Sequence, residues 1–308
     1  EEPVIYDEFQ TDKTVRQLSL YLKNKGYYYN KVNDSVYLND KRAEIVYEIK
    51  PNKPYIIRNI NYFFEDTGLR SLVLEDTVNT LVKSGNLFDA ELLQKERTRI
   101  EDLLRNKGYY KFSKEFIYFD ADTTVGNFMT DLTLILKNYI RINEFDQAVS
   151  LPHPLYHINS VYINSGYQRR SSIAEGPSEV LSLDTVAYDS VFLIHAQKPI
   201  AKKNVLIQSN YIEPGNIYQS IDVEDTYKHF SSLRLFRFIN IQFDEVNEIP
   251  SQGKNLLNCN IQLVPAKLQS YSFDIEGTNS SGNIGAAGNL TYSHNNLFAG
   301  AEIFDFKI

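Results

Sequence analysis

A short sequence that recurs within the chain limits its fold more than any other feature. Residues 24–28 read Asn-Lys-Gly-Tyr-Tyr, and residues 106–110 read the same. Each copy ends a stretch with apolar residues at helical spacing and precedes two runs in which apolar and polar residues alternate. A weaker third copy, Leu233-Arg-Leu-Phe236, has the same neighbours, with Arg234 in place of the glycine. Three copies in one context predict a series of small repeated domains.

The complete copies predict the order strand, helix, helix, strand, strand for each repeat. In the second copy these elements are Tyr55–Phe64, Leu69–Val82, a stripe from Leu92 to Leu104, Phe112–Phe119 and Phe128–Leu136. In the third they are His157–Asn164, Ala201–Tyr211, a stripe from Val223 to Phe230, Phe238–Val246 and Leu256–Val264. The first copy has only its last helix and the strands Lys31–Leu38 and Arg42–Ile49, so we expect the natural protein to begin before Glu1.

These elements predict four segments along the chain. They are the C-terminal part of a first repeat at 1–52, a second repeat at 53–140, a third repeat at 141–267, and a tail of different character at 268–308. The third repeat contains an insertion at about 166–198 that is rich in Ser, Gly and Asp. One strand-like run, Val186–Ala196, is expected inside this insertion.

The tail alternates between apolar and polar residues without a helix to cover it. Tyr271, Phe273 and Ile275 lie on one face of its first predicted strand, and two further alternating runs follow. Strands of about ten residues with this alternation are typical of transmembrane barrels, although a soluble antiparallel sheet alternates in the same way. Three strands cannot close a barrel, so we expect the natural protein to continue beyond Ile308.

The composition and the motifs argue against several classes of function. Acidic residues outnumber Lys and Arg by 39 to 32, whereas a nucleic-acid-binding protein needs a basic excess, so no nucleic acid is expected as a partner. The single cysteine, Cys259, cannot form an intramolecular disulfide. His153 and His157 are four apart, but prolines flank the first and argue against a helical metal site. Gly282–Gly288 lacks the Lys-Ser/Thr of a phosphate loop. We therefore predict no enzyme activity, no cofactor and no metal.

Taken in order, these segments resemble the BamA/TamA-type outer-membrane assembly family, also called the bacterial surface antigen family. The resemblance rests on the Asn-Lys-Gly-Tyr-Tyr corners, on Glu213–Tyr218, on the Leu233–Phe236 corner, and on residues 275–282 and 295–302, which look like first barrel strands. The abundance of Tyr and Asn and the insertion in the last repeat are most similar to the Bacteroidetes TamA-like members. The resemblance implies an α+β fold of tandem β-α-α-β-β POTRA repeats, the first one truncated, followed by the first strands of a transmembrane β-barrel.

The resemblance also implies a function. It is that of a periplasmic scaffold at the cell outer membrane, which binds unfolded outer-membrane protein clients and delivers them to its barrel. Periplasmic or lipoprotein accessory subunits, among them TamB-like proteins, would be further partners. An alternative is the POTRA region of a two-partner-secretion transporter that recognises one dedicated secreted substrate. A hydrolase with a β-sheet domain is a third reading that no motif supports.

Exposed sheet edges are the expected binding sites, because their unpaired backbone groups accept an extended strand of almost any sequence. The resemblance puts the second strand of each repeat at such an edge, where the candidate client-pairing residues are Val32, Val36, Phe116, Tyr118, Ile239 and Ile241. It puts the first tail strand at the lateral seam of the barrel, where the candidates are Tyr271, Phe273 and Ile275. Proline at Ser272 or Asp274 is expected to damage this seam. Alternatively, neighbouring repeats simply cap the edges.

Overall fold

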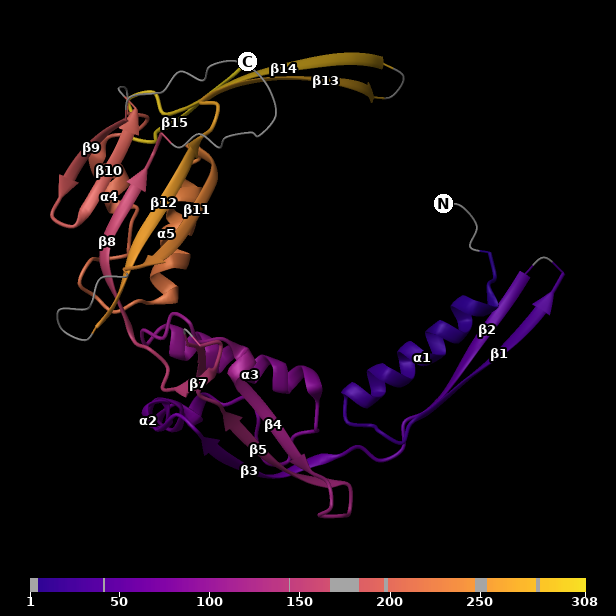
Figure 1. Cartoon of the computed structure of the whole chain (residues 1–308). Coiled ribbons are helices and arrows are strands. Elements are labelled where there is room, and N and C mark those ends of the chain that lie inside the picture. Colours follow the sequence, from indigo (N-terminus) through magenta and orange to yellow (C-terminus); the bar gives the residue numbers. More distant parts are fainter. Residues whose placement is uncertain are drawn as a thin grey trace. The chain divides into compact units, whose positions relative to one another are not determined.

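The computed structural model describes residues 5–40, 42–143, 145–166, 183–196, 199–246, 254–280 and 283–308. The chain forms two compact units (Figure 1). Unit 1 comprises Glu1–Leu104 and Lys111–His153, and unit 2 comprises Arg105–Tyr110 and Pro154–Ile308. No helix among the described residues is both long and apolar enough to cross a membrane.

Unit 1 begins with helix α1 (Glu8–Asn24), which packs on a hairpin of β1 (Lys31–Asn39) and β2 (Arg42–Lys50). The Asp7 carboxylate accepts a hydrogen bond from the Phe9 amide and starts the helix. Gly26 ends it with a φ of 90°, the left-handed conformation that glycine adopts without strain. β1 and β2 pair antiparallel as a two-stranded sheet.

The second repeat is complete and also belongs to unit 1. Its elements are β3 (Ile56–Phe64), α2 (Thr67–Glu75), the 3₁₀ turn η1 (Thr77–Asn79), α3 (Ala90–Arg105), the 3₁₀ turn η2 (Lys114–Phe116), β4 (Ile117–Asp122) and β5 (Met129–Leu136). The sheet order is β3-β5-β4, with β3 parallel and β4 antiparallel to β5. Ile57, Leu93 and Leu132 form a core between helix and sheet. A short antiparallel hairpin that the sequence did not suggest, β6 (Tyr139–Ile142) and β7 (Ala148–Leu151), follows β5.

Helix α2 is shorter than the predicted Leu69–Val82. Thr77 Oγ1 donates a hydrogen bond to the Leu74 carbonyl, and Asn79 Nδ2 donates one to Asp76 Oδ1. Side chains of this kind compete with the helical backbone bonds, so the helix ends before Asp76 and continues as the 3₁₀ turn.

Unit 2 contains the third repeat. Its elements are β8 (Tyr156–Asn164), β9 (Leu183–Tyr188), β10 (Val191–Ala196), α4 (Lys203–Gln208), α5 (Ser220–Ser232), β11 (Phe236–Glu245) and β12 (Asn255–Pro265). They form a five-stranded sheet in the order β11-β12-β8-β10-β9. The expectation of one strand over Val186–Ala196 was wrong. Asp189 adopts a φ of 51° and turns the chain, so two antiparallel strands form there.

The tail forms an antiparallel sheet of three strands within unit 2. These are β13 (Gln269–Ser280), β14 (Asn283–Asn295) and β15 (Ile303–Lys307), in that order. The buried Asn296 anchors the turn after β14, because its Nδ2 donates to the Ile200 carbonyl at 2.6 Å and its Oδ1 accepts from the Ala301 amide at 3.0 Å.

The two complete repeats agree in details beyond the order of their elements. In each first strand a bulge skips one residue, Arg58 in β3 and Asn159 in β8. Both bulge residues hydrogen-bond to the last strand of their repeat: Arg58 forms a bidentate pair with Asp131 on β5, and Asn159 binds Asn258 on β12. Equivalent residues of β3 and β8 differ by 101 in number. The predicted α+β organisation in β-α-α-β-β repeats is therefore confirmed.

Candidate functional site

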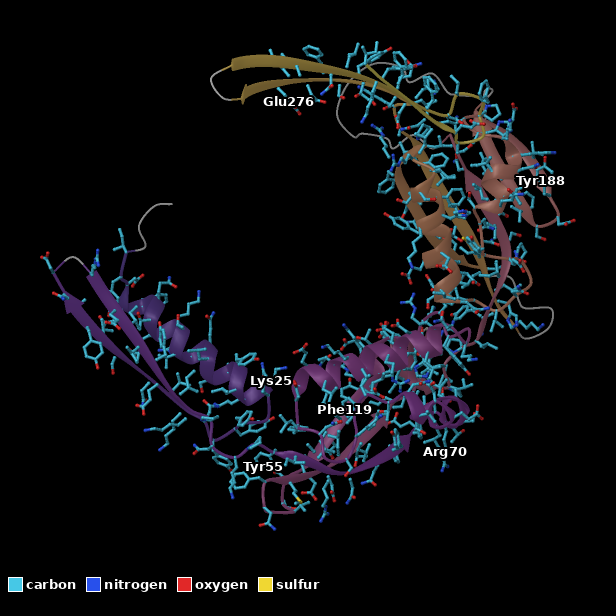
Figure 2. All side chains as sticks on the ribbon, turned by 180° about the vertical axis from the view of Figure 1, so that it is seen from behind. Lys25, Tyr55, Arg70, Phe119, Tyr188 and Glu276 are labelled. Carbon is cyan, nitrogen blue, oxygen red and sulfur yellow. The ribbon has the colours of Figure 1, made fainter. Side chains whose placement is uncertain are left out.

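β4 lies at one edge of the sheet of the second repeat (Figure 1). The Lys137 amide donates to the Phe116 carbonyl at 2.9 Å, which fixes the phase of the antiparallel ladder. Because hydrogen-bonded pairs alternate, the backbone of Tyr118 faces β5, whereas the backbone groups of Phe119 and Ala121 point out of the sheet. An added strand would therefore pair with Phe119 and Ala121. Figure 2 labels Phe119 on this strand.

Phe116 does not lie on the strand, contrary to the predicted strand Phe112–Phe119. The Ser113 hydroxyl accepts from the Glu115 amide and starts η2, so the chain becomes extended only at Ile117. The Phe116 ring packs 4.7 Å from the His153 ring. Tyr118 is on the strand and 47% exposed, with Lys137 Nζ 4.6 Å above its ring.

β11 lies at the corresponding edge of the sheet in unit 2. The Val246 amide donates to the Leu256 carbonyl at 3.0 Å, so the same alternation points the backbone groups of Ile239 and Ile241 outward. The side chains of both residues pack against the core of the unit. At Ile239 and Ile241 the backbone N–H and C=O groups therefore lie at the open edge, while the side chains pack in the core and stabilise the strand.

In the hairpin of unit 1 both strands are edges, because β1 and β2 pair only with each other among the described residues. Val32 and Val36 are half-buried, whereas Tyr37 and Leu38 are 60% and 72% exposed. A two-stranded sheet is marginal by itself, so an added strand would stabilise this hairpin most.

β13 lies at the edge of the tail sheet, with β14 beside it. The Asn295 amide donates to the Leu268 carbonyl at 2.8 Å, so the amides of Ser272 and Asp274 face β14. The backbone groups of Tyr271, Phe273 and Ile275 point out at the open edge. Proline at Ser272 or Asp274 would therefore break the ladder to β14, and the open edge itself is tested at Phe273.

One face of the tail sheet is apolar and exposed. Tyr271, Phe273 and Ile275 are 72%, 66% and 72% exposed. They pair across the sheet with Tyr292, Leu290 and Gly288, and Tyr292 pairs in turn with Phe306, which is 50% exposed. Soluble monomers rarely leave so continuous an apolar surface uncovered, so this face fits contact with a membrane or another chain.

The repeated corners hold equivalent aromatic clusters. The Gly108 carbonyl accepts from the Tyr156 amide at 2.9 Å, as the Gly26 carbonyl does from the Tyr55 amide. After each glycine a tyrosine packs on another tyrosine at the start of the next repeat. The ring of Tyr28 lies 5.6 Å from that of Tyr55, which directly precedes β3, and the ring of Tyr110 lies 5.7 Å from that of Tyr156, the first residue of β8. Lys25, labelled in Figure 2, adds hydrogen bonds to Asp89 and Glu91, which raise the pKa of its ammonium group.

His153 belongs to unit 1 and His157 to unit 2. His153 is buried, and its Nδ1 lies 3.0 Å from Asp66 Oδ2, which also accepts from the His153 amide. Burial lowers the pKa of His153, and the Asp66 carboxylate opposes part of that effect. No group of three His, Cys, Asp or Glu residues that could hold a metal occurs within the described residues.

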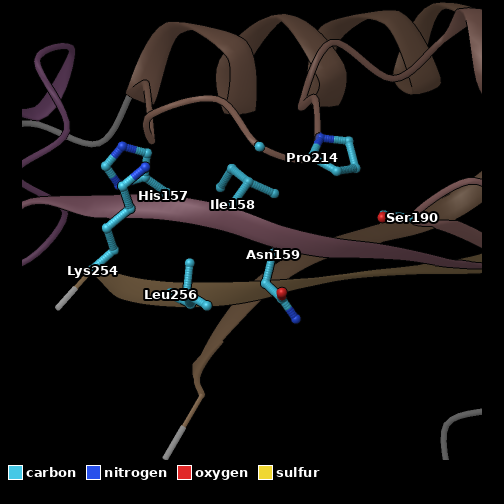
Figure 3. Close-up of a pocket in the computed structure, with 8 residues that line it drawn as sticks. His157, Ile158, Asn159, Ser190, Pro214, Lys254 and Leu256 are labelled. Atoms are coloured by element: carbon cyan, nitrogen blue, oxygen red, sulfur yellow. The ribbon is translucent and has the colours of Figure 1, made fainter. Parts of the chain in front are cut away.

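The structure shows a small polar pocket that the sequence did not suggest (Figure 3). It has a volume of about 350 Å³ and lies between β8 and the loop at Pro214 and Gly215, with His157 and Lys254 at its wall. Burial, and to a lesser extent the Lys254 charge, lowers the pKa of His157. None of the described residues that line the pocket is a carboxylate.

Several solved structures are similar to this chain, although no protein-family model and no curated protein sequence matches it. BamA from Haemophilus ducreyi lacking POTRA domains 1–3 is 10% identical, with a TM-score of 0.50 over 82% of this chain and 37% of that chain. POTRA domains 3–5 of Haemophilus influenzae BamA are 14% identical, with a TM-score of 0.44 over 85% and 83%. CdiB from Acinetobacter baumannii is 12% identical, with a TM-score of 0.35 over 99% and 47%.

Of these three structures, the Haemophilus ducreyi BamA reaches a TM-score of 0.50, and at 10% identity it shows a shared fold. The chain spans 37% of the length of that BamA chain. The fold of tandem POTRA-type repeats is thus supported by the elements of the chain and by this likeness. Activity and partners do not follow from a shared fold.

Proposed function

We propose that this chain is the POTRA region and the first barrel strands of an outer-membrane protein assembly or translocation factor of the BamA/TamA type. In this proposal residues 1–52, 53–140 and 141–267 are the repeats and residues 268–308 begin the barrel. The repeats lie in the periplasm and bind unfolded outer-membrane protein clients. Accessory periplasmic or lipoprotein subunits, TamB-like proteins among them, are further partners, and the chain belongs with the TamA-like members of Bacteroidetes.

One observation carries this proposal: repeats with an open edge strand continue directly into an exposed apolar sheet. β12 ends at Pro265 and β13 begins at Gln269, so three residues separate the last strand of the repeat from the first strand of the tail. The tail is fixed to the repeat, since the Lys202 amide donates to the Ala299 carbonyl and Asn296 Nδ2 donates to the Ile200 carbonyl. The third repeat and the tail therefore form a continuous structure within unit 2.

The edges supply the binding chemistry. Phe119, Ala121, Ile239 and Ile241 present backbone donors and acceptors that no strand occupies among the described residues. Backbone pairing tolerates any client sequence, and it suits clients whose own strands alternate between apolar and polar residues. The acidic excess of the chain adds no attraction for nucleic acid.

Client binding is tested with edge-blocking variants of this chain. Ala121→Pro and Ile241→Pro each remove one outward amide, a change that edge strands tolerate. Asp120→Ala and Ile241→Ala are the matched controls, because they leave every amide in place and Ile241→Ala removes the same core-packed side chain as Ile241→Pro. The probe is an eight-stranded outer-membrane barrel protein diluted from urea, and binding is followed by fluorescence anisotropy. We expect the double proline variant to bind several-fold more weakly than the double control.

The result that would contradict the proposal is a folded double proline variant that binds this client as tightly as the parent chain. Near-ultraviolet circular dichroism of the many tyrosines reports whether the variants are folded. An unfolded soluble helical protein serves as the control probe, and equal binding of both probes would also argue against a β-strand client.

The seam assignment is tested in the full-length protein in its outer membrane. Phe273→Pro removes an outward amide of β13, whereas Phe273→Ala removes only the side chain. We expect the proline variant to impair outer-membrane protein assembly and the alanine variant to remain close to wild type. Equal activity of both variants would refute the role of this edge.

A further inference from the structure

The insertion of the third repeat shows what can bind to the first strand of such a repeat. β10 lies parallel to β8 along its outer edge, with Val191, Leu193 and Ile194 beside Val161, Ile163 and Asn164. The Val161 amide donates to the Ser190 carbonyl and the Ser165 amide donates to the Ile194 carbonyl, both at 2.9 Å. Leu193 is 3% exposed and completes the core.

The equivalent edge of the second repeat is open. Among the described residues β3 pairs only with β5, so the outward backbone groups of Ile60, Tyr62 and Phe64 meet no strand. These residues correspond to Val161, Ile163 and Ser165 by the common bulge and by the pairing of each first strand with the last strand of its repeat.

Both edges are covered identically up to the point where β10 begins. In the second repeat the Ile57 amide donates to the Asn86 carbonyl, and the Gly85 amide donates to the Ile57 carbonyl. In the third repeat Ile158 makes the same two bonds with Asn216 and Gly215. The backbone contacts of the two loops end at the equivalent residue of each strand, and Ser84 Oγ adds a hydrogen bond to the Arg58 carbonyl in the second repeat. The vacant stretch of β3 therefore starts where the occupied stretch of β8 starts.

The residues of β3 are less buried than the equivalent residues of β8, which β10 covers. With β10 in place, Val161 and Ile163 are 0% exposed, whereas the corresponding Ile60 and Tyr62 are only half-buried. On the opposite face of the sheet Phe63 is 55% exposed. An added strand would bury apolar surface on both faces of β3, which favours its binding.

We propose that the β3 edge of the second repeat is a docking site for an extended polypeptide segment that pairs parallel to it at Ile60, Tyr62 and Phe64. The segment has apolar residues at its first and third positions, which face the helices as Val191 and Leu193 do. It has an apolar residue at its fourth position, which covers Phe63. This site is independent of the proposed client edges, because β3 and β4 are opposite edges of the sheet and the docked segment runs parallel to β3.

The chain's own β10 provides the probe. A peptide of the sequence Ser190–Ala196 with Ile194→Cys, extended by lysines for solubility, is offered under mild oxidation to the variant Phe63→Cys. By the register of β10 on β8, these two positions are neighbours on one face, at a separation that a disulfide spans. Tyr118→Cys on β4 is the matched control, since Tyr118 is 47% exposed at the other edge of the same sheet. Cys259 is buried and does not compete.

The peptide backbone supplies a second control. Parallel pairing points the amides at positions 192 and 194 toward the edge and those at 191 and 193 away from it. N-methylation at 192 and 194 should therefore abolish cross-linking, whereas N-methylation at 191 and 193 should preserve it. We expect the unmodified peptide to cross-link at least about tenfold faster to Phe63→Cys than to Tyr118→Cys.

Equal rates at the two cysteines, or equal effects of the two methylation patterns, would overturn the inference. Cross-linking to Tyr118→Cys alone would refute it while supporting the proposed client edge at β4. Cross-linking to Phe63→Cys alone would support it whatever happens in the client-binding assay, so the two proposals can fail separately.

Discussion

Asn106 caps a helix that begins 114 residues later, and removing its side chain tests how the corner of unit 2 is held. α5 starts at Ser220, and Gln219 at its N-cap position makes no side-chain cap. Instead Asn106 Oδ1 accepts from the Ile221 amide and from Ser220 Oγ, each at 2.8 Å. The amide is one of the unpaired donors that every helix start leaves.

The expected cost of Asn106→Ala follows from this geometry. Replacing an N-cap side chain by alanine typically costs about 0.5–2 kcal/mol. The bond to Ile221 is solvent-exposed, so water replaces the lost acceptor and the lower half applies, about 0.5–1 kcal/mol. Gln219 has φ −133° and ψ 128°, the extended conformation of an N-cap residue, so Gln219→Ser should supply a local cap. In that background Asn106→Ala should cost less than about 0.3 kcal/mol.

Native-state hydrogen exchange of α5 under increasing urea measures these free energies within unit 2. Lys107→Ala, at the neighbouring exposed position, is the control and should leave the free energy of opening unchanged. Serine is preferable to aspartate at position 219, because burial and the nearby Asp225 charge already raise the pKa of Asp222 in the first turn. Additive costs of Asn106→Ala and Gln219→Ser, with no rescue, would refute the capping role.

Three further predictions concern stability and reactivity. Gly108→Ala should destabilise unit 2 by about 1–3 kcal/mol, which is more than the cost of Gly215→Ala. Both glycines have a positive φ, but a Cβ on Gly108 would lie 2.6 Å from Leu155 Cδ1, whereas a Cβ on Gly215 would meet nothing within 4 Å. Equal urea midpoints of the two variants would contradict this prediction. Since burial lowers the pKa of His153, the unfolded chain binds its proton first, and unit 1 should lose stability as the pH falls below about 6.5, a loss that His153→Gln should abolish in a urea series at several pH values. Burial raises the pKa of the Cys259 thiol, so a thiol reagent should modify it only as fast as the protein unfolds, and rapid native labelling would count against that burial.

The sequence by itself determined the repeats and their corners. Gly26 and Gly108 have φ values of 90° and 97°, and Arg234 in the weaker copy adopts 56°, so the third corner has the same handedness without a glycine. Local geometry requires a left-handed residue at a helix end, and alternation with a period of two marks the strands, so both leave a readable pattern.

Only the tertiary structure decided which backbone groups lie at each edge. Alternation shows the side-chain faces of Tyr271 and Phe273, but whether their amides or that of Ser272 point outward depends on the pairing with β14. In the same way the placement of Phe116 depends on η2, and the β9–β10 hairpin depends on one turn at Asp189. The Asn106 cap has no local sequence pattern, because the helix that it caps begins 114 residues later. The vacant β3 edge has none either, because it is defined by the lack of a neighbouring strand among the described residues.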